Sequence, residues 1–447
     1  MAKQHSETDP NIVAADPAKG FFVSMLIKDI TLRDAIGDLV DNAVDAIKAR
    51  AEDLTNLKGY KIEIKLGKSF FSISDNGFGM EANVARETAF NFGKSASHKL
   101  IDKAIGQFGI GMKRAFFKLG SNIKVKSFAT TSQFELSIDV LEWLKEPQKW
   151  KFEFDKGTLK ENIKNNSNNT GLEIHISNLS FDSKTSFGDK TFIDTLQKEI
   201  SLEHMLNINK GLIIKIDGYT LESTEITLVS DENIKPTYWE KILTEQSVKI
   251  LAGISAKDAN EGGWYIFCND RLILAHNQGE ETGWGSEFAK YHSQFYRFRG
   301  YVFFEAINSS NLPWNTTKTG MDLDSPYYKE VKGKMKTMTL QVFDLLNKLK
   351  EEKEKDNPEE NQTLNKAVTK SLKTAIPVIQ IIDKAEVLNN KFHYPTILFN
   401  PTKKSNSIKI SYQVSEEKYN AIEQRLGESN PKEIGLKTFN YYYDNEL

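Results

Sequence analysis

The segment DAIGDLVDNAVDAIKAR, residues 34–50, constrains the fold most, because it joins a helical apolar stripe to an acidic and amide face. Asp38 and Asn42 lie four residues apart and therefore share one face of this helix. A carboxylate and a carboxamide that converge there can orient a water molecule and hold a metal ion. For this segment alone, a solvated polar face is the simpler interpretation. The apolar stripe consists of Ile36, Leu39, Val40, Ala43, Val44 and Ile47.

The first 185 residues or so mix helical and strand patterns. Helical patterns run over 32–50, 81–92 and 113–118. This mixture predicts an α/β or α+β domain. The β-rich runs are KIEIKL, FFSISD, IKVKSF, FELSI, WKFEF and LEIHISNL.

A second block starts near Thr191 with a helical stretch, and Asp217-Gly218 between two strands predicts a hairpin. A helical pattern from Tyr327 to Lys355 ends in the charge-rich stretch KEEKEKDNPEEN, the best linker candidate. Further strands are expected at SVKILAGIS, GGWYIFCNDRLILAHN and FRGYVFFEAIN. The expected division is 1–185, 186–350, a helical linker region over 351–402, and a small module over 403–447.

Bulk properties exclude some classes of protein. The formal net charge of -2 over 447 residues gives no global attraction to nucleic acid or anionic membranes, so any such binding is local. One cysteine, Cys268, excludes an internal disulfide framework and a cysteine-rich zinc site. The N-terminus is polar, and no apolar run is long enough to span a bilayer. We expect a soluble, cytoplasmic protein with no membrane partner.

Two glycine motifs follow the acidic helix. FSISDNGFGM places Asp75 at a strand end, before a turn in which glycine lets the backbone approach a ligand and the carboxylate can accept from an exocyclic amine. A plain tight turn is the alternative for this motif taken singly. IGQFGIGMKR opens a helix that carries Lys113 and Arg114, and such a glycine-rich helix start makes an anion site. The segment from Gly93 to Lys103 is rich in Ser and Lys, as a lid over a nucleotide would be.

These three motifs resemble, in order and spacing, those of the GHKL ATPases, the family of gyrase, heat-shock chaperone, histidine kinase and mismatch-repair proteins. DLVDN is similar to their N-box, SDNGFGM to their adenine loop, and IGQFGIGM to their second glycine box. The usual P-loop pattern is absent. The resemblance implies a Bergerat-type α/β sandwich that binds ATP and Mg²⁺ and hydrolyses ATP to ADP and phosphate.

By this resemblance, Asn42 binds Mg²⁺ and Asp75 receives the adenine amino group. Asp38 takes the place of the general base, where most hydrolysing members carry glutamate. Aspartate is one methylene shorter, and a misplacement of about 1 Å can cost roughly 10²-fold, so slow hydrolysis is expected. Asp41 and Asp45 match acidic positions in relatives and are interpreted as structural or supporting. The other expected nucleotide-binding residues are Gly77, Gly79, Met80, Lys94, Gly106, Gly109, Gly111, Lys113 and Thr170.

The resemblance to one branch of the family rests on three further segments: NTTKTGMDL, WYIFCNDRLILAHN and FFVSMLIKDITLRDAIGDLVDNAVDA. The loop NTTKTGMDL is similar to the transducer loop of the Microrchidia (MORC) ATPases, which implies that Lys318 reaches the γ-phosphate rather than being a solvated surface lysine. Thr170 precedes Gly171 where relatives carry a Gly-Thr turn, and it is expected to supply the hydroxyl that Leu172 lacks. In relatives, ATP joins two chains through their N-terminal segments, and the polar arm from Met1 to Lys19 is the candidate here. The chain looks most like a prokaryotic-type MORC or heat-shock-like ATPase.

The last block, strand, helix, turn and helix, resembles a ribbon-helix-helix module. Lys409, Ser411 and Gln413 would face DNA bases, but the acids and bases of this block balance, so a plain dimerisation handle is equally open. The expected function is an ATP-gated homodimeric clamp on DNA, in genome maintenance or antiviral defence. A heat-shock-type chaperone and a nucleotide-sensing scaffold with little turnover are the alternatives.

Overall fold

The computed structural model describes residues 18–92, 103–106, 109–166, 169–353, 363–383, 391–395 and 410–446. Its contacts divide the chain into two compact units, Met1–Pro395 and Thr396–Leu447, and each is described by itself. The expected site residues Lys94 and Lys409 lie outside the described residues, as do 1–17 of the expected arm and 93–102 of the expected lid.

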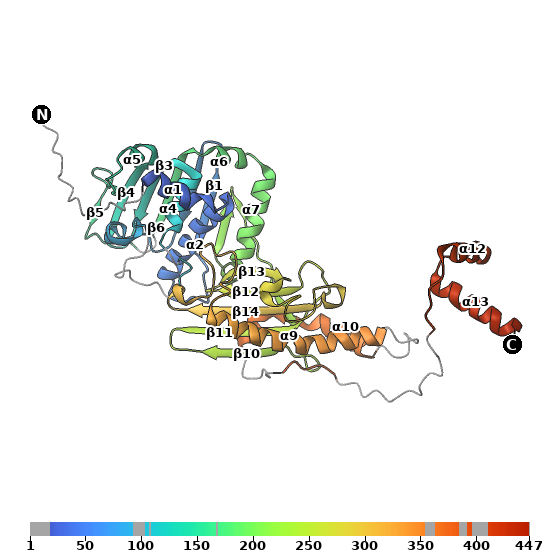
Figure 1. Ribbon diagram of the computed structural model, residues 1–447. Helices are drawn as coiled ribbons and strands as arrows, with labels where there is room; N and C mark the ends of the chain where they lie inside the picture. The colour runs from blue at the N-terminus through green and yellow to red at the C-terminus, as the bar shows by residue number, and fades with distance from the viewer. Residues whose placement is uncertain are drawn as a thin grey trace, which may run out of the picture. The chain divides into compact units, whose positions relative to one another are not determined.

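An eight-stranded sheet forms the N-terminal part of the first unit (Figure 1). Its strands are β1 (Lys61–Leu66), β2 (Phe70–Asp75), β3 (Gly120–Phe128), β4 (Ser132–Asp139), β5 (Lys160–Glu161), β6 (Gly171–Leu179), β7 (Ile213–Ile216) and β8 (Tyr219–Thr220). Their order is β5-β4-β3-β6-β2-β1-β7-β8, and the neighbours are antiparallel except β1 and β7. In β1, Ile62 and Ile64 are buried while Lys61 and Lys65 are exposed, so the alternation of the sequence sets which face packs.

Two helices on the buried face of this sheet carry much of the candidate site. They are α2 (Leu32–Arg50) and α4 (Gly111–Leu119), which pack against each other and against β2 and β3. A capping box starts α2: Thr31 Oγ1 accepts from the Asp34 N–H at 3.1 Å, and Asp34 Oδ2 accepts from the Thr31 N–H at 2.9 Å. The predicted apolar stripe of α2 is buried. The polar residues Asp38, Asn42 and Asp45 of the same helix line a cavity.

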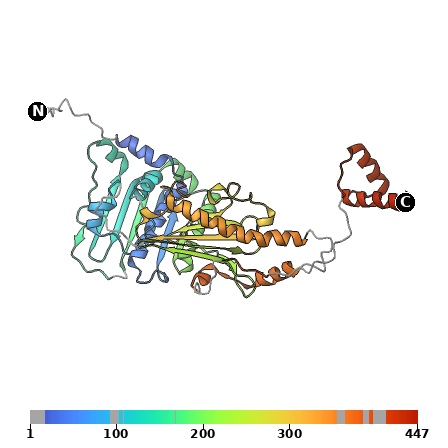
Figure 2. The ribbon, with the colours of Figure 1, turned by 60° about the horizontal axis from the view of Figure 1, so that its bottom comes forward.

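A five-stranded sheet follows, in the order β10-β11-β14-β12-β13. Helix α9 (Pro326–Lys353) packs against β11 and β14, and Figure 2 shows it running along the sheet. An apolar cluster on the sheet contains Tyr265, Phe267 and Phe303, together with Met205 and Val378 from other elements. The strands are β10 (Thr237–Ile242), β11 (Gln246–Ile254), β12 (Gly263–Cys268), β13 (Arg271–Asn277) and β14 (Phe298–Ala306).

The remaining elements of the first unit are mostly short. Within the part of the chain that the structure describes, no helix has both the length and the apolar character needed to cross a membrane. The helices are α1 (Lys19–Lys28), α3 (Ala82–Val84), the π-helix η1 (Ala85–Ala89), α5 (Val140–Lys145), α6 (Phe181–Ser186), α7 (Lys190–Glu203), α8 (Met205–Asn209), α10 (Thr363–Ser371), α11 (Val378–Asp383) and the 3₁₀ turns η3 (Glu280–Thr282), η4 (Ser293–Phe295), η5 (Ser309–Asn311) and η6 (Leu372–Thr374). Strands β9 (Thr227–Val229) and β15 (Ala375–Pro377) pair with each other.

The structure departs from two expectations about strands in this unit. WKFEF is not a strand, because Trp150 and Phe152 turn into an aromatic cluster with Trp143 instead of joining a ladder; Phe154 makes a single bridge to Leu136. The predicted hairpin at 217–218 forms between β7 and β8, but β7 pairs with β1. The first sheet therefore continues past residue 185, where the sequence placed a boundary.

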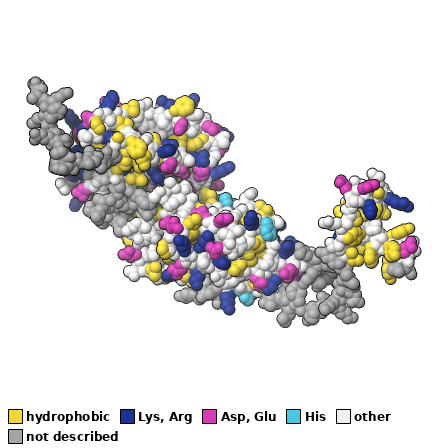
Figure 3. Space-filling view, in the orientation of Figure 1, with side chains coloured by type: hydrophobic (Ala, Val, Ile, Leu, Met, Phe, Trp, Pro, Cys, Tyr) yellow, Lys and Arg dark blue, Asp and Glu magenta, His cyan; other side chains and the backbone are white. Residues whose placement is uncertain are grey.

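The C-terminal unit contains α12 (Glu416–Leu426) and α13 (Pro431–Glu446), as the sequence predicts, with Gly427 ending α12 in a left-handed conformation at φ 63°. Residues 410–414 form no strand within the described chain. The alternating apolar pattern of Ile410, Tyr412 and Val414 predicts that they face a core, but all three are exposed. Ile434 alone is buried among the described residues of this unit, and Figure 3 shows apolar side chains uncovered on it. The large exposed ones are Ile410, Tyr412, Val414, Ile422, Leu426, Leu436, Phe439, Tyr441, Tyr442 and Tyr443.

Candidate active site

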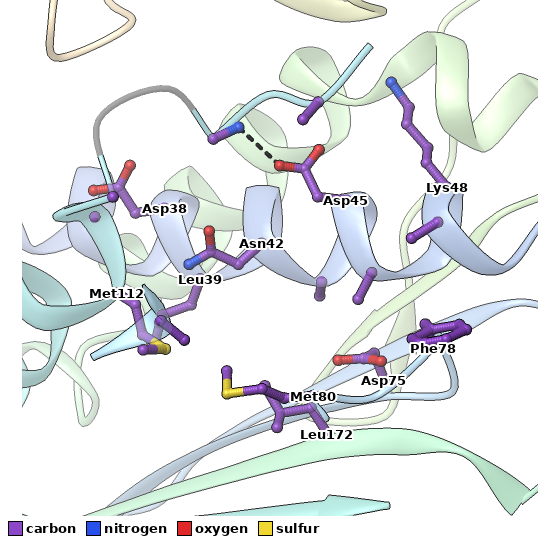
Figure 4. A pocket seen from close by; sticks show the side chains of 18 of the residues that line it. Asp38, Leu39, Asn42, Asp45, Lys48, Asp75, Phe78, Met80, Met112 and Leu172 are labelled. Carbon is purple, nitrogen blue, oxygen red and sulfur yellow. Dashed lines mark hydrogen bonds between the residues drawn. The ribbon is translucent and has the colours of Figure 1, made fainter. Parts of the chain in front are cut away.

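One cavity brings together most of the predicted site residues. Its volume is about 890 Å³, within the usual range for small-molecule sites, and α2, the end of β2, the start of α4 and the loop at 316–318 surround it (Figure 4). The predicted residues that line it are Asp38, Asn42, Asp75, Gly79, Met80, Gly106, Gly109, Gly111, Lys113 and Lys318. Gly77 and Thr170 lie beside the lining: the Thr170 hydroxyl donates to the Gly77 carbonyl at 2.7 Å.

The polar side of α2 faces this cavity. Asp38, Asn42 and Asp45 project from one side of the helix, and Asp75 lies across the cavity (Figure 4). Among the described residues, the Asn42 amide donates no hydrogen bond, although its nitrogen is buried. Asp45 accepts from the N–H groups of Ile105 and Gly106, each at 2.7 Å, so it anchors the segment before the glycine turn, in agreement with its structural interpretation.

Asp75 lies at the carboxyl end of β2, and its Oδ1 accepts from the Gly77 N–H at 2.7 Å. Burial raises the pKa of this carboxyl to about 7, although hydrogen bonds from the backbone of Gly77 and Leu172 oppose the shift. A half-buried acceptor of this kind suits a ligand that donates a hydrogen bond.

The glycines beside Asp75 are required by close packing. A Cβ on Gly77 would lie 2.6 Å from the backbone of Ala46 on α2. Gly79 has φ +75°, and a Cβ there would lie 2.3 Å from the Phe128 carbonyl. The turn after β2 can therefore approach α2 and β3 only because these positions lack side chains.

The second glycine turn leads into α4 and closes on Asp38. A Cβ on Gly111 would lie 3.2 Å from the Asp38 carboxyl group, so the bare backbone lets α4 begin against that carboxylate. Lys113 on this helix lines the cavity, but its amine donates to the carbonyls of Ala89, at 2.8 Å, and Gly109. Burial lowers the pKa of Lys113 to about 8. It is a buried cation whose hydrogen-bond partners among the described residues are neutral carbonyl groups.

A chain of alternating buried charges lies at the other end of the cavity. Asp38 Oδ2 accepts from Arg114 Nε at 2.5 Å, and Asp38 Oδ1 lies 3.3 Å from Lys318 Nζ. The same Lys318 amine contacts Asp41 Oδ2 at 2.6 Å, and Asp41 Oδ1 accepts from Arg271 Nε at 2.9 Å. Burial alone would raise the pKa of Asp41, but the charges of Arg271 and Lys318 hold it well below its usual value. These ion pairs connect α2 to α4, to β13 and to the loop at Lys318.

The loop that carries Lys318 is tightly built. Asn315 accepts from the Lys318 N–H at 3.0 Å through its carbonyl and from the Thr319 N–H at 3.0 Å through its side chain. Glu281 accepts from the Met321 N–H at 2.6 Å. Lys318 itself has φ 59°, in the left-handed region that non-glycine residues seldom adopt. The loop therefore holds a strained residue with its amine in the cavity wall.

Arg271 reaches the site from a hairpin of the second sheet and was not predicted from the sequence. It follows the turn residues Asn269 and Asp270, which have φ 48° and 68°, and it donates to the Lys318 carbonyl at 3.0 Å. Its second partner is Glu203, at 3.1 Å. The Asn-Asp pair between two apolar strands was the available signal for this hairpin. Arg114 was noted in the sequence as a second cation of the glycine motif. Nothing in the sequence spacing indicated that Asp38 would be its partner.

Comparison with known proteins decides the family. Residues 30–170 match the family model described as Histidine kinase-, DNA gyrase B-, and HSP90-like ATPase. The N-terminal domain belongs to the GHKL ATPase family. A curated relative, the DNA mismatch repair protein MutL of Aquifex pyrophilus, is 22% identical over 276 residues, which cover 58% of this chain and 60% of the relative. The chain thus aligns with less than two thirds of that relative. The GHKL match contains the N-box helix α2, the Asp75 turn and the glycine turn before α4.

Proposed function

We propose that this GHKL protein binds ATP with Mg²⁺ in the cavity described above and hydrolyses it slowly. The observation that carries the proposal is the single cavity joining Asp75 at one end to Asn42, Asp38 and Lys318 at the other. Asp75 accepts from the adenine amino group, and the glycine turns give the purine and the phosphates access to the backbone. Lys113 adds a cation beside the phosphates once its amine gives up its hydrogen bonds to the carbonyls of Ala89 and Gly109.

The magnesium site fits the donor set around Asn42. No cluster of three or more His, Cys, Asp or Glu side chains able to hold a metal exists among the described residues. Mg²⁺ commonly takes few protein ligands and completes its shell with phosphate oxygens and water. The Asn42 side chain lines the cavity, and its carbonyl oxygen is the proposed protein ligand. Its amide nitrogen is buried without a hydrogen-bond partner among the described residues. The ion would supply charge neutralisation for the triphosphate.

Asp38 is the proposed general base, and Lys318 the proposed contact of the terminal phosphate. The attacking water forms a bond from its oxygen to the terminal phosphorus, and it gives its proton to Asp38. The bond from that phosphorus to the bridging oxygen breaks, and its electron pair stays with ADP. Lys318 comes from outside the GHKL match, so its contact would couple the second sheet to the nucleotide state.

We further propose that the full chain works as an ATP-gated homodimeric clamp on DNA, of MORC-like type. The relative that aligns with this chain is named a DNA mismatch repair protein. The exposed apolar residues of the C-terminal unit support a second copy as its partner, since its described part, two helices with one buried residue, lacks a core of its own. In a ribbon-helix-helix dimer, residues around 410–414 would pair with the same segment of that copy, with Ser411 and Gln413 toward the bases.

Calorimetry and ATPase assays test the nucleotide site. Asp75→Asn should weaken Mg-ATP binding, because the amide presents a donor where adenine also donates. Asp38→Ala should keep binding and abolish hydrolysis. Wild-type hydrolysis by Asp38→Ala would refute the general base, and absence of any nucleotide binding by the wild type would refute the site. For DNA, duplex-stimulated ATPase activity that disappears on Lys409→Glu is expected; indifference to DNA favours a protein client.

A further inference from the structure

The two carboxylates near Lys318 each have a second cationic partner. Asp38 is 4% exposed and accepts from Arg114 Nε at 2.5 Å through Oδ2. Asp41 is fully buried and accepts from Arg271 Nε at 2.9 Å through Oδ1. A buried carboxylate that loses its only cationic partner is strongly destabilised. Lys318 can therefore leave both carboxylates without stranding either charge.

Lys318 also lies against one of the two carboxylate oxygens of Asp38, Oδ1. Lys318 Nζ lies 3.3 Å from Asp38 Oδ1 but 2.6 Å from Asp41 Oδ2, so Asp41 is its stronger partner. With Arg114 on Oδ2 and Lys318 on Oδ1, both oxygens of Asp38 face cations. Movement of the amine toward an anionic ligand would expose Oδ1 and leave Oδ2 held.

We propose that Arg114 is a positioning residue for hydrolysis, whose Nε holds Asp38 so that Oδ1 is the oxygen that accepts the proton of the attacking water. The inference rests on the proposed function and adds the residue that orients the base. A carboxylate fixed through one oxygen keeps its rotamer, and rotation about the Cβ–Cγ bond would otherwise exchange the two oxygens. Arg114 is 6% exposed and lines the cavity, so the ion pair is largely shielded from bulk water.

A purely structural ion pair between α2 and α4 is the competing explanation. In that case loss of Arg114 would lower stability and nucleotide binding together. The helices already pack along their length, and Gly111 brings the start of α4 against Asp38. A positioning role predicts a different pattern, in which turnover falls while binding persists.

The test uses the full chain with Arg114→Met, Arg114→Lys and the control Arg86→Met. Arg86 also binds a carboxylate through two nitrogens, at 2.9 and 2.7 Å from Glu161, but the pair is exposed and does not line the cavity. Arg114→Met should lower kcat by about 10²-fold, since a displacement of about 1 Å has that effect. Its affinity for a non-hydrolysable ATP analogue should change little, and its thermal midpoint should fall only modestly, because Lys318 still pairs with Asp38. Arg114→Lys should recover part of kcat, and Arg86→Met should match the wild type.

A second comparison assigns the effect to Asp38. In an Asp38→Asn background, adding Arg114→Met should cause no further loss of kcat, because both changes disable one unit. Unchanged kcat in Arg114→Met while Asp38→Asn is inactive would overturn the positioning role and leave the proposed base intact. Equal losses in binding and turnover would overturn it in favour of a structural pair. Wild-type turnover by Asp38→Asn would overturn the base itself and the inference with it.

Discussion

At the scale of single residues, burial tunes two side chains of the cavity in opposite directions. The pKa of Asp75 is raised to about 7 and that of Lys113 lowered to about 8. Asp75 accepts a hydrogen bond more strongly when it is ionised, so affinity for adenine should fall as the pH drops below its pKa. Lys113 attracts phosphate only when protonated, so affinity should also fall above about pH 8. Calorimetric titration of ATP across this range should show a narrow optimum, and Lys113→Met should lose the alkaline fall alone. A flat profile in the wild type would contradict both assignments.

Gly77 gives a second prediction at this scale. Because a Cβ there would lie 2.6 Å from the Ala46 backbone, Gly77→Ala should push the Asp75 turn away from α2. We expect a loss of about 1–3 kcal/mol in the free energy of unfolding, together with weaker ATP binding. Gly20→Ala is the matched control: a Cβ there meets nothing within 4 Å, and alanine favours the α1 helix. Thermal unfolding of the two variants should shift in opposite directions, and a shared direction would refute the packing argument.

At the scale of elements, local pattern predicted much of the secondary structure. Helix α2 and strands β1 and β2 occupy the predicted residues, because alternating or helical burial is readable from neighbours in sequence. The strand predicted at WKFEF was wrong, because two of its aromatic side chains pack into a tertiary aromatic cluster and its backbone makes a single bridge to β4 instead of pairing along a strand. The Arg271–Asp41 pair joins residues 230 positions apart, so no local pattern could indicate it.

The hairpin of β12 and β13 helps to connect the two sheets through Asn269 at its tip. Substitution of Asn269 tests that connection. Its side chain donates to the carbonyls of Ala104, at 2.9 Å, and Ala306, at 3.1 Å, and accepts from the Ala306 N–H at 2.9 Å. Asn269→Ala should lower the free energy of unfolding by about 2–3 kcal/mol, because buried backbone groups lose their partners. Asn178→Ala is the control, since Asn178 has a similar φ of 49° but an exposed side-chain bond to Ser121. Equal losses in denaturant unfolding would mean that the left-handed backbone, rather than the buried contact, matters.

At the scale of the whole molecule, the ordered motifs predicted residues that line one cavity, because each motif brings its own backbone geometry. Asp75, Asn42 and the glycine turns line one cavity although they were inferred from separate segments. The buried charge cluster could not be predicted from the sequence. Its cations, Arg114, Arg271 and Lys318, come from three distant parts of the chain and meet only through the packing of both sheets. A local sequence pattern does not show which side chains from distant segments meet in the folded protein.

The C-terminal unit carries the last prediction, which concerns assembly. Leu436 and Phe439 on α13 are 53% and 54% exposed, so a second copy that covers them would make the chain a dimer without nucleotide. Leu436→Glu with Phe439→Glu should give the mass of one chain in sedimentation, because each buried carboxylate would lack a partner. Asn440→Glu adds charge at a neighbouring exposed position and should keep the wild-type mass. If wild type and both variants sediment as single chains, the C-terminal unit does not dimerise the protein, and an ATP-gated clamp would then depend on its N-terminal domains alone.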